Sequence, residues 1–292
     1  MKNVAVLVLS LLSFIGVQSQ SIVDASEIIE KINKGQDVIY ENTIIEGDID
    51  LTHNEAILYK NLNLDKYISS DIDDLLDRTS HNYFVEIDSK IEFINCEFEG
   101  DLIGYRVDEE ENRMYNAKFN NSVTFAGCTF NGEMNFKYTV FEQETEIESS
   151  FIENNSNFKY AQFNNQVNFS GSSFSKSSDF NCAQFAGLAV FQGTDFYQKA
   201  RFNQASFKDA VYFTETSFSE KALFTYAKFK QAVFNNAQFD GDGNFAYSIF
   251  DEGVKFVNAK FKDKATFDNA KYDDIDLEGT SFQILPGLTK AF

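Results

Sequence analysis

Large apolar residues return along most of this chain at an unusual interval. From Phe119 to Tyr272 the aromatic positions alternate between spacings of six and five residues, apart from a weaker patch around Ile147 and Ile152. An amphipathic helix would repeat its apolar residues every three or four positions, and a strand would alternate every two. The interval therefore predicts a polygonal coil in which each short side points one Phe at the axis. The expected core ladder contains Phe163, Phe174, Phe185, Phe196, Phe207, Phe218, Phe229, Phe250 and Phe261.

A small residue stands two positions before many of these phenylalanines, as Ala161, Ala183 and Ala205 do. In this repeat the chain resembles the pentapeptide-repeat family, whose repeats centre on Leu or Phe with a small residue two positions earlier. The resemblance covers residues 85–282. It implies an all-β fold, a right-handed quadrilateral parallel β-helix, whose four sides would here take five, six, five and six residues. We expect about seven to eight coils over that span, each rising about 4.8 Å.

Three places depart from the rhythm. Ile147 and Ile152 replace Phe on either side of Phe151, and the spacing from Phe229 through Phe234 to Phe239 is one residue short. Each of these two places predicts a bulge or a shortened corner. Residues 104–113 break the rhythm completely and predict a projecting loop.

The segments outside the repeat have other signatures. Residues 21–36 predict a short capping helix that starts at Asp24 or Ser26 and stops at Gly35. Residues 37–92 contain Ile- and Leu-based first coils, interrupted at 61–82 by an acidic excursion, before the Phe-centred β-helix at 93–282. The tail at 283–292 either folds over the last coil or leaves that end to pair with another copy, since an open sheet edge invites association.

Residues 1–20 read as an export signal. Lys2 is followed by an apolar run from Val4 to Val17 and then by small residues. The alternative is a membrane anchor, but the run is about 14 residues where a spanning helix needs about 20. We therefore expect the protein to be exported, to the periplasm, the cell surface or the outside. The sequence leaves open whether the signal is cleaved.

The formal net charge of −20 is unevenly distributed. Residues 1–117 carry 9 basic and 24 acidic residues, whereas residues 118–272 carry 15 and 17. Binding to nucleic acid phosphates requires a basic face, so no nucleic acid partner is expected. The family resemblance also implies an alternative, because some members are DNA mimics that bind DNA gyrase. Here the acid lies before the repeat body, which weakens that alternative.

Few residues suggest a disulfide or a metal site. Cys96 and Cys128 occupy the small inward position, and they could pair only if residues 104–113 are a pure insertion. Asp240, Asp242 and Asn244 form a weak calcium-binding pattern. The alternative is that these residues simply occupy corners of the solenoid. A second acidic group, at Asp71, Asp73, Asp74 and Asp77, is most simply a solvated face.

The sequence contains no Gly-rich phosphate loop, nucleophile elbow or histidine constellation. We therefore predict no catalytic residues, no cofactor and a non-enzymatic role. The first hypothesis is an exported scaffold or protein-interaction module that binds an unknown protein or self-associates through a solenoid end. The second is the gyrase-binding DNA mimic. The third, a polysaccharide-active β-helix enzyme, rests on analogy with unrelated folds alone.

Overall fold

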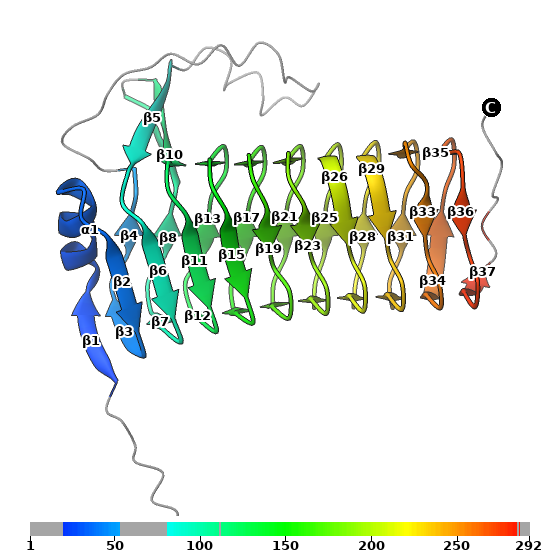
Figure 1. The fold of residues 1–292 in the computed structure, drawn as a ribbon, viewed down its shortest axis with the longest axis horizontal. Coiled ribbons are helices and arrows are strands. Elements are labelled where there is room, and N and C mark those ends of the chain that lie inside the picture. Colours follow the sequence, from blue (N-terminus) through cyan, green and yellow to red (C-terminus); the bar gives the residue numbers. More distant parts are fainter. Residues whose placement is uncertain (1–19, 53–80, 111, 285, 287–292) are drawn as a thin grey trace, which may run out of the picture.

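The computed structural model describes residues 20–52, 81–110, 112–284 and 286, which form a rod of stacked coils (Figure 1). The rod makes about 11 turns and contains one helix. Each coil has four short sides, which we number in chain order, and equivalent strands of neighbouring coils pair in parallel. The predicted all-β parallel solenoid is therefore confirmed.

The first two sides form one wall of the rod. The first side contains β5 (His81–Ile87), β10 (Arg113–Phe119), β14 (Val140–Phe141), β18 (Gln162–Phe163), β22 (Gln184–Phe185), β32 (Ile249–Phe250) and β35 (Lys271–Tyr272). The second contains β2 (Val38–Glu41), β6 (Ile91–Ile94), β11 (Val123–Ala126), β15 (Thr145–Glu148), β19 (Val167–Asn168), β23 (Ala189–Val190), β33 (Val254–Lys255) and β36 (Ile275–Asp276). Two longer strands, β26 (Ser206–Tyr212) and β29 (Lys228–Val233), run across both sides.

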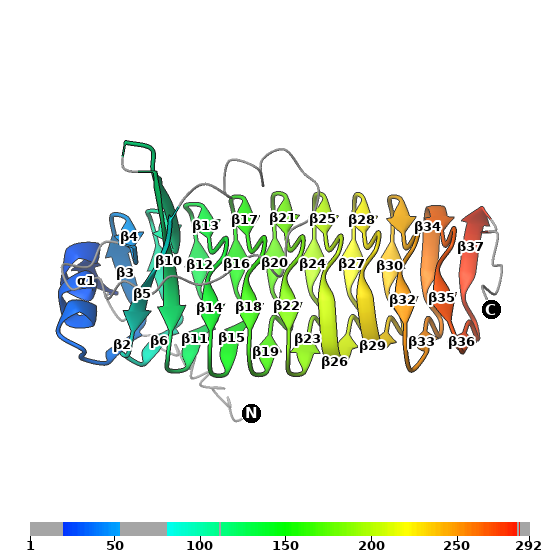
Figure 2. The ribbon, with the colours of Figure 1, turned by 90° about the horizontal axis from the view of Figure 1, so that it is seen from above.

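The other two sides complete each coil (Figure 2). The third side contains β1 (Ser21–Asp24), β3 (Thr43–Glu46), β7 (Glu97–Phe98), β12 (Thr129–Phe130), β16 (Phe151–Ile152), β20 (Ser173–Phe174), β24 (Asp195–Phe196), β27 (Ser217–Phe218), β30 (Gln238–Phe239) and β37 (Ser281–Ile284). The fourth contains β4 (Ile49–Asp50), β8 (Leu102–Ile103), β13 (Met134–Asn135), β17 (Ser156–Asn157), β21 (Ser178–Asp179), β25 (Ala200–Arg201), β28 (Ala222–Leu223) and β31 (Gly243–Asn244). One longer strand, β34 (Lys260–Thr266), runs from the third side to the fourth.

One coil takes 22 residues over most of the rod. Phe163 pairs with Phe185, and Phe185 pairs with Phe207, as four sides of five, six, five and six residues require. The estimate of about seven to eight coils between residues 85 and 282 was low. The third side is repeated nine times there, in β7, β12, β16, β20, β24, β27, β30, β34 and β37.

The core is a set of four ring columns. Ladder rings stack on the rings one coil away, as Phe158 does on Phe180 with centroids 4.9 Å apart, and meet rings of other columns edge-on, as Phe158 meets Phe169 at 80°. Burying one Phe contributes about 1.5–3 kcal/mol, and an aromatic pair adds about 0.5–1.5 kcal/mol. All nine predicted ladder residues are at most 2% exposed.

Two of the predicted irregularities have different outcomes. No register shift occurs around Ile147 and Ile152, which pair in register with Phe125 and Phe130 and are fully buried. The bulge expected there was wrong, because Phe151 is 39% exposed and does not belong to the ladder.

The second irregularity is confirmed. The pairing of β26 with β29 shifts by one residue after Phe207. A further shift, after Phe261 in the pairing of β34 with β37, was not predicted. Each shift shortens one coil by a residue while the ring columns continue.

The described part of the insertion, residues 104–110 and 112–113, forms a hairpin that projects from the rod where a loop was expected. Its strand β9 (Tyr105–Asp108) pairs antiparallel with β10, which also pairs with β5 over seven residues. These strands rise out of the rod near its N-terminal end (Figures 1 and 2). We call this projection, formed by residues 81–84, 105–108 and 113–116, the fin.

The N-terminal end is covered by α1 (Ala25–Asn33), as predicted. The Asp24 carboxylate accepts the Ser26 amide at 2.8 Å, and the helix buries Ile28 and Ile32 on the first coil. Strand β1, which the sequence did not predict, pairs with β3 and adds a partial coil under the helix. Within the residues described, no helix has the length and apolarity to cross a membrane.

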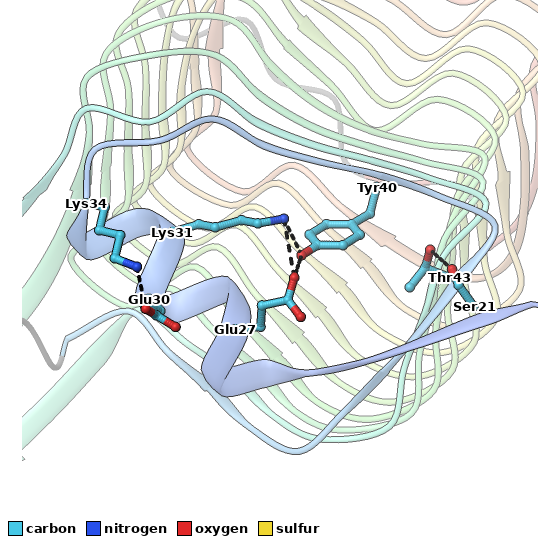
Figure 3. A network of polar contacts seen from close by, with 7 residues as sticks. All are labelled: Ser21, Glu27, Glu30, Lys31, Lys34, Tyr40 and Thr43. Carbon is cyan, nitrogen blue, oxygen red and sulfur yellow. Dashed lines mark hydrogen bonds and ion pairs between the residues drawn. The ribbon is translucent and has the colours of Figure 1, made fainter.

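A polar network fixes the cap to the first coil (Figure 3). The Lys31 ammonium donates to the Tyr40 hydroxyl at 2.7 Å, and that hydroxyl donates to Glu27 at 3.0 Å. Burial raises the pKa of Tyr40, and the hydrogen bond to Tyr40 raises the pKa of Lys31. The hydroxyls of Ser21 and Thr43 are also 2.6 Å apart.

Several predictions fall outside the described residues. They are the export signal up to residue 19, the acidic excursion up to residue 80 with its Asp71–Asp77 cluster, and the tail from residue 287.

Candidate interaction surface

The two inward cysteines lie on adjacent coils of the third side. Thr129 pairs with Glu97, and the Thr129 amide donates to the Cys96 carbonyl at 2.9 Å, so residues 104–113 are a pure insertion. Cys96 and Cys128 are nevertheless both free thiols, exposed by 2% and 1%. The neighbouring Cys96 thiol, followed by burial, raises the pKa of Cys128.

Both thiols continue a column of buried hydroxyls. Cys128 Sγ donates to the Phe93 carbonyl at 3.3 Å, just as Ser150 Oγ donates to the Phe125 carbonyl at 3.1 Å. The same inward position and the same bond recur in Ser172, Thr194 and Thr216. The cysteines therefore act as hydroxyl substitutes inside the coil.

The weak calcium candidates do not share a site. Asp240 pairs with Lys262 at 3.0 Å, and Asp242 pairs with Lys221 at 3.1 Å. The Asn244 side chain accepts the Ala246 amide at 2.9 Å. Among the residues that the structure describes, no three His, Cys, Asp or Glu side chains gather closely enough to hold a metal ion. Calcium binding stays a prediction, and the ligands it needs already have partners.

One carboxylate is partly buried on the fourth side. Asp179 pairs with Asn157 of the preceding coil, and its carboxylate accepts the Asn181 amide at 2.8 Å. Burial raises the pKa of Asp179, which the Asn181 amide and the positive charges of Arg201 and Lys159 partly oppose. The sequence contained no signal for this carboxylate beyond its place in the repeat.

The rod has two columns of left-handed corners with different residues. The corner between the second and third sides follows the expected preference for Gly and Asn, at Asn42, Asn95, Gly127, Gly171, Gly193, Asn236, Asn258 and Gly279, with Ser149 and Glu215 as exceptions. The corner between the fourth and first sides contains Tyr138, Tyr160, Cys182, Gln204, Tyr226, Tyr247 and Asn269, with φ between 56° and 61°. We call it the tyrosine corner. A left-handed backbone costs a residue with a Cβ about 1–2 kcal/mol, so folding does not explain these tyrosines.

The tyrosines form two stacked pairs. Tyr138 and Tyr160 have centroids 4.8 Å apart with planes 2° from parallel, and Tyr226 and Tyr247 have centroids 4.7 Å apart. In the first pair, Lys159 lies 5.1 Å from the Tyr160 ring. The second pair is the more exposed, at 53% for Tyr226 and 45% for Tyr247.

A notch of about 260 Å³ separates the two pairs. It lies where the smaller Cys182 and Gln204 take the corner positions. Its polar wall is ordered, because Asn181 Oδ1 accepts the Asn203 amide at 3.0 Å and Asn203 Oδ1 accepts the Thr225 amide at 3.1 Å. The lining residues are Lys159, Tyr160, Asn181, Cys182, Asn203, Gln204, Thr225 and Tyr226.

Sequence reasoning missed the tyrosine corner, although a signal was present. Each of these tyrosines stands two positions after a ladder residue, as in Phe136-Lys-Tyr138, Phe158-Lys-Tyr160, Phe224-Thr-Tyr226 and Phe245-Ala-Tyr247. The motif returns at the coil period, and this identifies one corner of the rod.

Four-sided parallel coils around stacked Phe columns define this protein as a β-solenoid. Residues 202–249 match the family model described as pentapeptide repeats (9 copies). The same four-sided coil continues on both sides of the matched segment, so the repeat that this family model describes extends along the rod. No curated protein matches the chain at a significant level.

Proposed function

We propose that this chain is a non-enzymatic, exported scaffold or protein-interaction module. The observation that carries the proposal is the separation of side-chain types between the inside and the outside of the coils. The large apolar residues of each coil point into the ring columns, and most outward positions present polar or charged side chains. Pentapeptide-repeat proteins are generally structural or binding proteins, which supports this choice.

The non-enzymatic part is supported by the contents of the notch. Its lining contains a lysine, two tyrosines, a thiol and amides, but no carboxylate and no histidine. Glycoside hydrolysis usually requires two carboxylates that flank the bond to be cleaved. Incubation of the purified chain with acidic and neutral polysaccharides should therefore release no sugar, and released reducing ends would contradict the proposal.

Export is supported by the pattern of residues 1–20. The test uses the full chain with a C-terminal tag, fractionated from its own host, with mass spectrometry of the recovered N-terminus. We expect the tag outside the cytoplasm. A matched variant with Lys2→Glu and Leu9→Arg should stay inside, because it removes the positive start and interrupts the apolar run. Recovery of the unaltered chain in the cytosol with Met1 intact would rule out export.

The binding role is tested in the same fractions. Crosslinking in intact cells, followed by recovery through the tag, should yield a specific protein partner or a covalent oligomer of the chain. A rod recovered only as an uncrosslinked monomer would contradict an interaction role.

A further inference from the structure

We propose that the tyrosine corner is a contact between two antiparallel copies of this chain. In this contact the exposed Tyr226–Tyr247 pair of each copy fills the notch of the other. The inference goes beyond the proposed function, since it concerns the purified chain alone and is independent of export and of any other partner.

The spacing of the rings fits the notch. Neighbouring coils rise by about 4.8 Å, so Tyr160 and Tyr226, three coils apart, face each other across about 14 Å. The ring column lacks two members there, at Cys182 and Gln204. Two rings separated by 4.7 Å, the distance between Tyr226 and Tyr247, match those two missing members.

One symmetry operation fills both notches. A two-fold axis perpendicular to the rod, between the levels of Gln204 and Tyr226, places Tyr226 of the second copy opposite Gln204. It also places Tyr247 of the second copy opposite Cys182, and the reverse contacts follow by symmetry. Such a contact is isologous and closes at two copies. The outcome is one column of eight rings, made of Tyr138, Tyr160, Tyr226 and Tyr247 from each copy.

The fin distinguishes this register from the alternative. It arises at the same corner, between β8 and β10, one coil before Tyr138. In the proposed register the fin of one copy lies past the last described corner of the other, Asn269. If the Tyr138–Tyr160 pair filled the notch instead, the fin would meet the rod of the second copy at the level of Tyr226.

The charges favour the antiparallel arrangement. At the level of Tyr160, Lys159 of one copy faces the exposed Asp268 of the other. The acidic N-terminal coils, built from the described residues 20–52, 81–110 and 112–117, then lie at opposite ends of the pair, whereas a parallel pair would place them side by side. Complementary charges fix register and suppress wrong arrangements.

The contact also accounts for the strained corner. Tyrosines are held with φ near 60° at Tyr226 and Tyr247, where Asn269 shows that a less strained residue fits the same column. The strained backbone at these tyrosines is explained if it directs their rings at a second copy. Because the contact follows a single corner, its area falls in the class of small, reversible interfaces.

Sedimentation of the chain from Ser21 onward, at concentrations up to about 1 mM because interfaces of this size are weak, tests the contact. We expect a reversible monomer–dimer equilibrium. Replacing the pair by the residue found at position 269, Tyr226→Asn with Tyr247→Asn, should raise the dissociation constant at least about tenfold, since buried tyrosines dominate such contacts. Gln204→Tyr should do the same, because its ring would occupy the notch.

Tyr197→Ala is the matched control. Tyr197 is also exposed, at 48%, but it lies at another corner, so its removal should leave the dimer unchanged. A chain that stays monomeric at every concentration would overturn the proposal. So would a dimer that neither the Asn pair nor Gln204→Tyr weakens.

The register is tested by oxidation of a Lys159→Cys, Asp268→Cys variant, with Cys182→Ser in the background. The double variant should form a covalent dimer, and each single variant should not, because position 159 faces position 268 and not itself. Crosslinking of the single variants at the same rate would overturn the antiparallel register. Asp268→Lys should weaken the dimer, and Asp273→Lys, the same charge change near a different corner, should not.

Discussion

Phe185 stacks on Phe207 with ring centroids 4.5 Å apart and ring planes 6° from parallel, although a full coil of chain separates them. The two residues are direct partners in the parallel pairing of β22 with β26. A ladder ring therefore contacts the coil before it and the coil after it, and stability is a sum over neighbouring coils.

Truncation of a ladder ring should be costly. Phe185→Ala is expected to lower the free energy of unfolding by about 3–5 kcal/mol, since it leaves a cavity that the stacked coils cannot close. Phe151→Ala removes the same ring from a position that is 39% exposed, and should cost less than about 1 kcal/mol. Urea unfolding of both variants compares them, and equal losses would contradict the assignment of Ile152 to the ladder.

Two glycines should respond differently to a methyl group. A Cβ at Gly132 would overlap the backbone carbonyl of Gly100 in the preceding coil, so Gly132→Ala should cost about 3 kcal/mol. Gly193 has φ of 63° and open space around its Cβ position, so Gly193→Ala should lose only about 1 kcal/mol, from backbone strain. Thermal unfolding ranks the two variants, and the reverse order would show that the coils are not this close at Gly132.

The buried thiols should behave as hydroxyls. Cys128→Ser preserves the donor to the Phe93 carbonyl and copies Ser150, so it should change stability by less than about 1 kcal/mol. Cys128→Ala should cost more, because it removes that donor. In a Cys182→Ser background, a thiol reagent should modify neither Cys96 nor Cys128 until the chain unfolds, and both afterwards. Absence of reactive thiols after unfolding would indicate a disulfide instead.

Asp179 makes stability depend on pH. Its folded pKa is raised by burial above the ordinary value, so between those two pKa values the native state holds the proton more strongly, and stability falls as pH rises through this window. Asp179→Asn should therefore stabilise the protein at neutral pH, by about 1 kcal/mol at most because water still reaches this carboxylate. The gain should vanish as pH falls below the unfolded pKa.

Urea midpoints of the Asp179→Asn variant at neutral and acidic pH measure this difference. Asp209→Asn, at an exposed carboxylate that pairs with Lys230, is the control and should give no such gain. A gain of the same size at both pH values would mean that the substitution acts by packing rather than charge.

The phenylalanine ladder could be predicted from the sequence because every coil requires a large apolar side chain at the same positions. The sequence misled around Phe151, which sits one residue early and suggested a bulge, whereas Ile152 continues the ladder with no register shift and Phe151 points outward. The cysteines could not be placed from spacing alone, because their separation depends on whether residues 104–113 are a pure insertion. Their placement on adjacent coils became visible only from the pairing of β7 with β12 and of β8 with β13.

The tyrosine corner could not be predicted for a different reason. Hydrophobic periodicity reports which residues point inward, and it contains no information on backbone handedness at the corners. The structure shows that Tyr226 has φ of 60° and that Gly and Asn dominate the other left-handed corner. That contrast, rather than the presence of tyrosine, distinguishes this surface.

The 22-residue coil also relates the number of residues in the chain to the length of the rod in fixed steps. Duplication or deletion of one coil, for example the span from Phe163 to Gln184, would change the length by one strand spacing, about 4.8 Å, and leave every ring column, corner and pairing register intact. The number of residues and the length of the rod therefore change together in uniform steps. Distances between features on the surface, such as the fin and the notch, can change during evolution without a redesign of the core.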